Sequence, residues 1–186
     1  MSLTLITAPV GEPLTLAEIK FFLRVAHDTD DSLITDLAEA ARGQVEAVTG
    51  LALMTQGWRL TLDRWPTEPV TLLRPPVQSV TSVSVQGTDG IWTELDEGDY
   101  ALIPGYPARV LLKAPPPSPG IAAGGIRIDF TAGFGDADAV PGTLKQAMRL
   151  LTAHYHEHRT PASERRVTTL PNSVGALLAP WREVRL

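Results

Sequence analysis

The hydrophobic period of this 186-residue chain changes twice, and this change restricts the possible folds more than any other feature. Apolar residues recur every three to four positions up to about residue 50, and again from about residue 140. Between residues 52 and 135 they alternate with polar residues. The first spacing predicts amphipathic helices, and the second predicts half-buried strands. We therefore predict an α+β fold, with helices toward both ends of the chain and an antiparallel β-sheet or small sandwich inserted between them in sequence.

Residues 1–51 are predicted to form an N-terminal helical part with two helices. Thr15 and Glu18 have the spacing of a capping box, which predicts a short helix over about residues 15–25. A longer helix is predicted to begin at Asp30 or Asp31 and to end at Gly50, because acidic residues favour helix starts and glycine favours helix ends.

The β insertion is predicted to span residues 52–135. It contains seven short runs rich in Val, Ile, Thr and aromatic residues, separated by Pro and Gly. Asp89 and Gly90 are typical of a hairpin turn. The stretch APPPSPGIAAGG, residues 114–125, is predicted to be a loop at the edge of the sheet because it is rich in Pro and Gly.

A third helix is predicted over residues 140–159. Pro141 suits the first turn, and Leu144, Ala147, Met148, Leu151 and Tyr155 share one face. Residues 160–186 have no sustained period, so they are predicted to form an extended C-terminal arm that becomes ordered on a partner.

Composition excludes several classes of function. The chain has no cysteine, which excludes disulfides, thiolate metal sites and cysteine nucleophiles. No run of about 18 apolar residues could cross a bilayer, so no membrane role is expected. The net charge of −5 disfavours a protein that grips DNA. From Arg159 onward five Arg and two Glu give a charge of +3, which leaves −8 on the preceding body and predicts different partners for the two parts.

His154, Glu157 and His158 have the spacing of a helical zinc site. Such a site needs a third protein ligand, and Glu164 and Glu183 are the acidic residues that follow, both in the irregular arm. The other interpretation is a polar last turn of an ordinary helix, where His complements the helix dipole. We favour the second interpretation and expect neither a metal nor any other cofactor.

The segment DTDDSLITD has oxygen ligands at alternate positions, as calcium loops do, but it lacks their central glycine and distant glutamate. Capping of a helix is the preferred interpretation. No serine lies in a Gly-x-Ser-x-Gly setting, so no serine nucleophile is predicted.

The order of the parts resembles a known family. The segments PLTLAEIKFFLRVAHDTDD, RPPVQSV and FTAGFGDADAVP, the last leading into the final helix, together resemble the head-tail connector (adaptor) family of long-tailed phages and phage-like gene transfer agents. The similarity extends from about Pro13 to Arg159 with several gaps. A polar ending such as HYHEHR is common in the last helix of that family, which implies no metal role.

This resemblance implies a structural protein without catalysis. It also implies a helical bundle that carries the β insertion, is completed by the helix at residues 140–159 and is followed by a C-terminal arm that reaches into the portal. It implies a homo-oligomeric ring, usually of twelve subunits, below the portal protein, with a tail-side stopper or tail terminator as the next partner and with double-stranded DNA passing through without specific binding. We infer portal binding for residues of the arm and a ring interface for residues of the three helices. The portal set is Arg165, Arg166, Leu177, Leu178, Trp181 and Arg182, and the ring set is Leu16, Phe22, Leu33, Leu37, Met148 and Tyr155.

Two other functions stay open on the sequence alone. One is a metal-dependent hydrolase that uses His154, Glu157 and His158. The other is a small binding module whose β insertion recognises a ligand.

Overall fold

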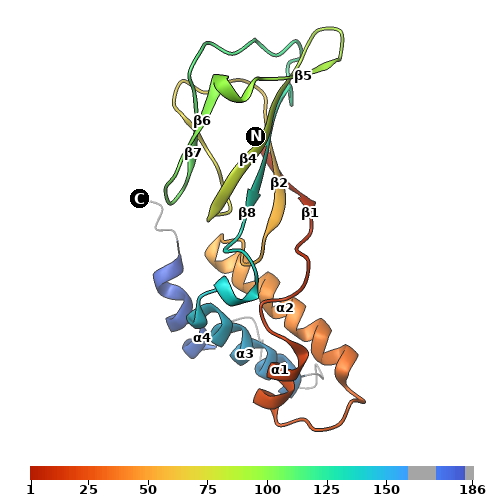
Figure 1. Cartoon of the computed structure of the whole chain (residues 1–186). Coiled ribbons are helices and arrows are strands. Elements are labelled where there is room, and N and C mark those ends of the chain that lie inside the picture. The colour runs from red at the N-terminus through yellow and green to blue at the C-terminus, as the bar shows by residue number, and fades with distance from the viewer. Residues whose placement is uncertain (159–170, 183–186) are drawn as a thin grey trace, which may run out of the picture. The chain divides into compact units, whose positions relative to one another are not determined.

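The computed structural model describes residues 1–158 and 171–182, and it confirms an α+β fold (Figure 1). The chain divides into two compact units. The β unit consists of residues 1–10 and 55–134, and the helical unit consists of residues 11–54 and 135–186. None of the helices in the described ranges has the length and apolar character that a membrane span requires.

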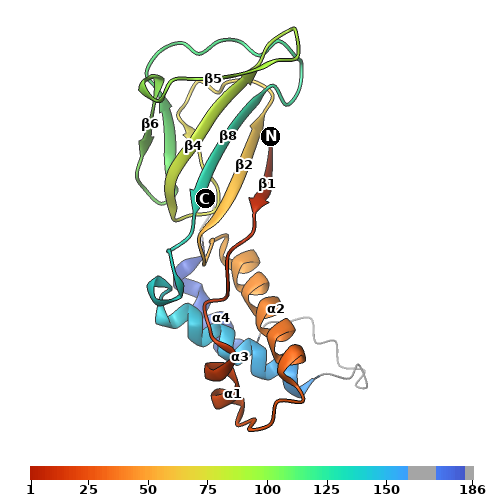
Figure 2. The ribbon, with the colours of Figure 1, turned by 45° about the vertical axis from the view of Figure 1, so that its right-hand side comes forward.

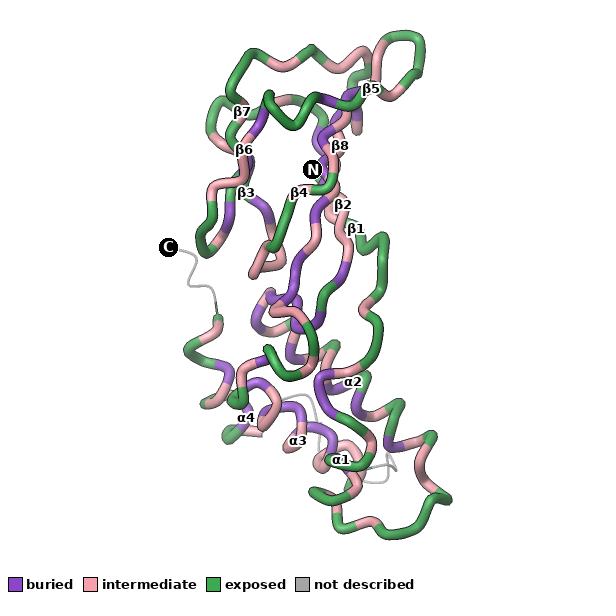
Figure 3. Tube along the Cα trace, viewed as in Figure 1, coloured by how far each residue is buried: buried purple, intermediate pink, exposed green. Residues whose placement is uncertain are grey.

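The larger sheet of the β unit is antiparallel, with the strand order β1-β2-β8-β4-β5. Figure 2 shows β4, β8, β2 and β1 side by side. Along β8 buried residues alternate with partly exposed ones, as the twofold period predicts, and β2 follows the same pattern except at Trp58, which is partly exposed (Figure 3). The bounds are β1 Ser2–Thr7, β2 Gln56–Leu62, β4 Val77–Gln86, β5 Trp92–Glu94 and β8 Ile126–Ala132.

A smaller antiparallel sheet, ordered β3-β7-β6, completes the β unit. Its strands are β3 Val70–Thr71, β6 Tyr100–Ile103 and β7 Arg109–Leu112. Apolar side chains of both sheets are buried within the unit, which gives the predicted small sandwich its core. These side chains are Leu60, Val70, Leu72, Val83, Val85, Val110, Ile126, Ile128 and Phe130.

The predicted hairpin turn at Asp89 and Gly90 is confirmed. It joins β4 to β5, Gly90 has a positive φ of 81°, and the backbone N–H of Ile91 donates to the Asp89 carboxylate at 3.0 Å. A positive φ is the conformation for which glycine is favoured.

Strand β1 was not predicted. Residues 2–7 pair with β2 at an edge of the larger sheet, so they do not belong to the predicted helical part. Leucine and threonine alternate at residues 3–5. This alternation is too short, and has no turn before it, so it does not identify a strand from the sequence alone.

The helical unit is built from α1 Leu16–Leu23, α2 Asp31–Thr49 and α3 Gly142–Glu157, with a further short helix, α4 Asn172–Leu178. The predicted capping box is present, because Thr15 accepts from the N–H of Glu18 and the Glu18 carboxylate accepts from the N–H of Thr15. Gly50 ends α2 with a φ of 76°, as predicted.

The core of the helical unit lies where α2, α3 and α4 pack together. Each helix contributes residues at helical spacing. These buried residues are Ile34, Ala38, Ala41 and Val45 of α2, Leu144, Ala147, Met148 and Leu151 of α3, and Val174 and Leu178 of α4.

Helix α4 is a correction to the predicted extended arm. Residues 172–178 are helical and pack against α3, with Val174 and Leu178 fully buried. The two buried apolar residues of α4 are four positions apart. A single such spacing is too short a pattern to identify a helix from the sequence. The rest of the predicted arm, residues 160–170 and 183–186, lies outside the described residues.

Candidate interaction surfaces

The histidine cluster at the end of α3 is held by contacts among its own residues. The His154 and His158 ring centroids are 4.4 Å apart, and the ring nitrogen Nδ1 of His158 lies 2.8 Å from the carbonyl oxygen of His154. Glu157 is exposed. Within residues 1–158 and 171–182, no group of three or more His, Cys, Asp or Glu side chains could hold a metal ion. The described geometry therefore gives no support to a metal-dependent hydrolase.

The predicted portal-binding residues differ in how far they are buried. Leu178 is fully buried in the helical unit, so its side chain is not available to a partner in this conformation. Leu177 and Trp181 are partly buried, and Arg182 is exposed. The indole Nε1 of Trp181 donates to the hydroxyl of Thr143, at the start of α3, at 3.2 Å. Arg165 and Arg166 lie outside the described residues.

The predicted ring-interface residues also differ in burial. Met148 is fully buried between the helices, so it belongs to the core of the unit and not to its surface. Leu16, Leu33, Leu37 and Tyr155 are partly buried, and burial raises the pKa of Tyr155.

Phe22 is exposed at 37%, and its neighbour Phe21, which sequence analysis did not select, is exposed at 88%. Both lie on α1. Two adjacent aromatic residues in a short apolar helix were a visible feature, but a period alone does not say which of them faces the solvent.

Comparison with known proteins identifies the family. A family model described as "Head completion protein" matches residues 12–183. The chain belongs to the head completion protein family.

Solved structures agree with this family. The chain is similar to a chain from the virion of a native gene transfer agent particle, with 31% identity and a TM-score of 0.85. It is also similar to a chain from the neck of an empty gene transfer agent particle computed with C6 symmetry, with 32% identity and a TM-score of 0.86. A chain from the neck of a native particle computed with C12 symmetry has 33% identity and a TM-score of 0.81. Each match covers 100% of this chain and 97% of the other chain. No functionally curated protein matches it.

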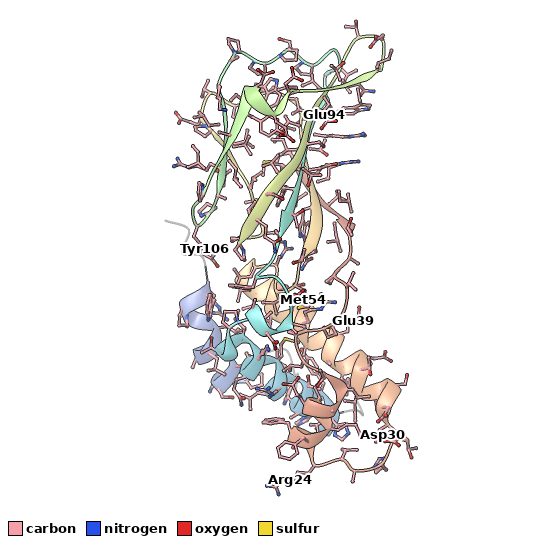
Figure 4. All side chains as sticks on the ribbon, in the orientation of Figure 1. Arg24, Asp30, Glu39, Met54, Glu94 and Tyr106 are labelled. Atoms are coloured by element: carbon pink, nitrogen blue, oxygen red, sulfur yellow. The ribbon has the colours of Figure 1, made fainter. Side chains whose placement is uncertain are left out.

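In this head completion protein, the excess of acidic over basic residues is largest in the first helical segment. Residues 11–54 contain eight acidic and three basic residues. Two of the three basic residues are held by carboxylates: Lys20 contacts Asp28 at 2.5 Å and Asp31 at 2.6 Å, and Arg42 contacts a group of three glutamates. The third, Arg24, is exposed at the end of α1 (Figure 4).

The Arg42 cluster ties the two ends of segment 11–54 to the middle of α2. The Arg42 guanidinium contacts Glu12 at 2.8 Å, Glu46 at 3.1 Å and Glu39 at 3.7 Å. A second oxygen of Glu46 accepts from the backbone N–H of Leu53 at 2.9 Å. Burial raises the pKa of Glu12. Arg42 opposes this shift, and the nearby carboxylates of Glu39 and Glu46 add to it. Sequence analysis missed this cluster, since Glu12 and Arg42 are 30 positions apart.

The β unit presents a second polar surface on the larger sheet. Arg59 of β2 binds Asp129 of β8 through two hydrogen bonds of 2.7 Å. The guanidinium of Arg127 lies 3.8 Å from the ring centroid of Trp92. Both pairs lie on the face opposite Leu60, Ile126 and Ile128, so this face of the larger sheet carries charged side chains.

Proposed function

We propose that this chain is a structural head-tail connector: copies form a ring below the portal of a phage or a gene transfer agent particle, join the DNA-filled head to the tail, and let DNA pass. The observation that carries the proposal is the similarity, over the whole chain, to chains from gene transfer agent particles, two of them from necks computed with C6 and C12 symmetry. Family membership points to a structural role without enzyme activity.

A connector acts through shape and charge. DNA leaving the head must pass the ring without adhering to it, and clustered Lys and Arg would retain phosphate. Residues 1–158 carry a net charge of −8, which suits a channel that repels the DNA backbone. We place the DNA-facing surface on the acidic segment 11–54.

The proposed partners are the portal protein on the head side and a stopper or tail terminator protein on the tail side. We propose that the C-terminal end, including Arg165, Arg166, Leu177, Trp181 and Arg182, binds the portal. Leu178 is excluded from this surface because it is buried in the helical unit.

Removal of the gene from a host that produces the particle tests the function. DNA-containing heads and free tails should accumulate unjoined, and the wild-type chain supplied in trans should restore joined particles, counted by electron microscopy. Joined particles in normal number without the chain would contradict a connector role.

Portal binding is tested separately by truncation. Deletion from Ala162 onward should abolish co-purification with the portal, while circular dichroism reports whether the remaining helices stay folded. Unchanged co-purification would contradict portal docking by the C-terminal end.

Point variants sharpen this test. Trp181→Ala should weaken portal binding more than Arg182→Ala, since buried aromatics contribute more to interfaces than charges at the rim. Thr143→Val is the matched control, because it removes the hydrogen bond to Trp181 and keeps the indole. Loss of binding in Thr143→Val equal to that in Trp181→Ala would show that the position of α4, and not the indole, is required.

A further inference from the structure

Helix α1 has apolar side chains that the described residues leave exposed. Six of its eight residues, LAEIKFFL, are apolar, which is typical of a helix that is buried on all sides. Yet Ile19 is its buried residue, while Phe21 is exposed at 88% and Phe22 at 37%. Large aromatics presented together on a surface are typical of a protein-protein contact.

The two phenylalanines are held on a fixed helix. The Thr15 and Glu18 capping box closes its start, and Arg24, with a φ of 58°, closes its end through bonds from its N–H to the carbonyls of Lys20 and Phe21. Lys20 binds Asp28 and Asp31 at the start of α2. A partner would therefore meet a preordered surface, and little conformational entropy would be lost on binding.

We propose that Phe21 and Phe22 bind the outer face of α2 in a neighbouring copy of this chain, and that this contact closes the ring. The outer face of α2 consists of Asp36, Ala40, Gly43 and Ala47, which are all exposed and lie opposite the buried Ala38, Ala41 and Val45. Side chains this small leave room for an aromatic ring to approach the helix backbone.

No contact among the described residues explains the glycine at position 43. A Cβ at this position would meet nothing within 4 Å, and glycine inside a helix costs about 1 kcal/mol relative to alanine. A close approach by a group outside the chain would account for a glycine there.

Charge complements shape at this contact. Arg24 follows the phenylalanines at the end of α1, and Glu39 lies on α2 (Figure 4). Asp36 and Glu39 are both neighbours of Ala40 on the surface of α2. Docking of Phe21 near Ala40 and Gly43 would place the guanidinium of Arg24 near these carboxylates. Opposite charges at the edge of an apolar contact favour one orientation over others.

A second copy is the partner that this arrangement favours. A closed ring of identical chains needs two different and complementary surfaces on each chain. The aromatic surface and the small-residue surface are both on the helical unit. Arg24 adds an exposed positive charge to the first surface, where Glu18 is already paired with Arg149, and Asp36 and Glu39 add exposed negative charges to the second. This inference rests on the proposed ring, and it assigns residues to the ring's interface.

Two single variants and their mixture test the contact. Phe21→Asp removes the aromatic surface, and Gly43→Phe fills the small-residue surface; neither side chain is buried in the monomer. Each variant alone should fail to form rings, with association weakened by about 30-fold or more, as expected for a residue central to an interface. Mixed in equal amounts they should form heterodimers. The aromatic surface of Gly43→Phe can bind the small-residue surface of Phe21→Asp, and the remaining surface of each copy is blocked, so no third copy can be added.

Sedimentation velocity, with the portal present if the wild type needs it to assemble, is the measurement. Ile91→Asp in the β unit, where the wild-type side chain is 63% exposed, is the matched control and should assemble as the wild type does. A double variant, Arg24→Asp with Asp36→Arg, should restore assembly lost in either single variant.

The outcomes separate this inference from the proposed function. Wild-type rings together with unchanged rings in Phe21→Asp or Gly43→Phe would overturn the contact and leave the connector role standing. Loss of portal binding by Phe21→Asp with intact rings would assign the phenylalanines to the portal and would also overturn it. A wild type that assembles neither alone nor on the portal would overturn the proposed ring itself.

Discussion

The β unit and the helical unit differ in how their backbones are held together and in which apolar residues they expose. In the β unit, adjacent strands pair through their backbones and alternate residues fill one core, so its exposed apolar residues, such as Leu5, Ile91 and Tyr106, are scattered over an edge strand and turns. In the helical unit, a narrow apolar face is supplemented by ion pairs between distant segments, and two adjacent phenylalanines remain exposed. The exposed apolar residues of the β unit are spread over β1, β7 and the loops, whereas the helical unit presents two adjacent phenylalanines on one helix, the surface that we propose for a partner.

This difference separates stability from assembly. Changes in the sandwich core should affect folding, changes in the ion pairs should affect the helical unit to a smaller extent, and changes at Phe21 should affect association while folding stays intact. The following predictions test the first two parts of this comparison.

The largest effect is expected in the sandwich core. Phe130→Ala should lower the free energy of unfolding by about 3–5 kcal/mol, because Phe130 is 1% exposed and its removal leaves a cavity. Ile91→Ala, at the turn between β4 and β5, should change it by less than about 0.5 kcal/mol. Urea unfolding monitored by circular dichroism gives both values. Equal effects would show that burial does not determine stability in this unit.

An intermediate effect is expected at Arg42. Arg42→Met should lower the free energy of unfolding by roughly 2 kcal/mol, below the cost of breaking a fully buried pair because the cluster is partly exposed. The matched control is Arg149→Met, whose pair with Glu18 lies at the surface and should contribute less than about 1 kcal/mol. A loss at Arg149 as large as that at Arg42 would contradict the central role given to the cluster.

The smallest effect concerns pH, with opposite directions at two glutamates. Hydrogen bonding to the backbone of Thr15 lowers the pKa of Glu18, so its contribution to stability is present above its unfolded value of 4.5 and is lost as the pH falls through the folded pKa. Burial raises the pKa of Glu12, so its contribution is present below 4.5 and is lost as the pH rises through the folded pKa.

Glu18→Gln and Glu12→Gln isolate these contributions. Glu18→Gln should be less stable than the wild type near neutral pH and equally stable in acid. The stability of Glu12→Gln relative to the wild type should increase as the pH rises. Thermal unfolding measured across this pH range compares them. Parallel curves for the wild type and both variants would contradict the two pKa directions.

The sequence predicted those parts of the fold that have a long or regular local pattern. The capping box at Thr15, the end of α2 at Gly50, the turn at Asp89 and the seven later strands follow from period and turn chemistry. Strand β1 and helix α4 were missed because each is short and depends on tertiary packing.

The candidate surfaces were predicted less completely. Apolar residues at helical spacing identify the helix face that faces a core, but they do not show whether that core belongs to the same chain or to a neighbour. Met148 and Leu178 proved to be buried within the chain, while Phe21 proved to be exposed. The Arg42 cluster joins residues distant in sequence, and no local pattern predicts such a contact.

The most direct test of the connector role is to image the full-length wild-type chain together with the portal by electron cryomicroscopy. The account predicts a closed ring of copies, twelve if it follows the C12 neck, coaxial with the portal and with an open channel. Single chains bound at scattered positions, or a portal that carries none, would contradict it.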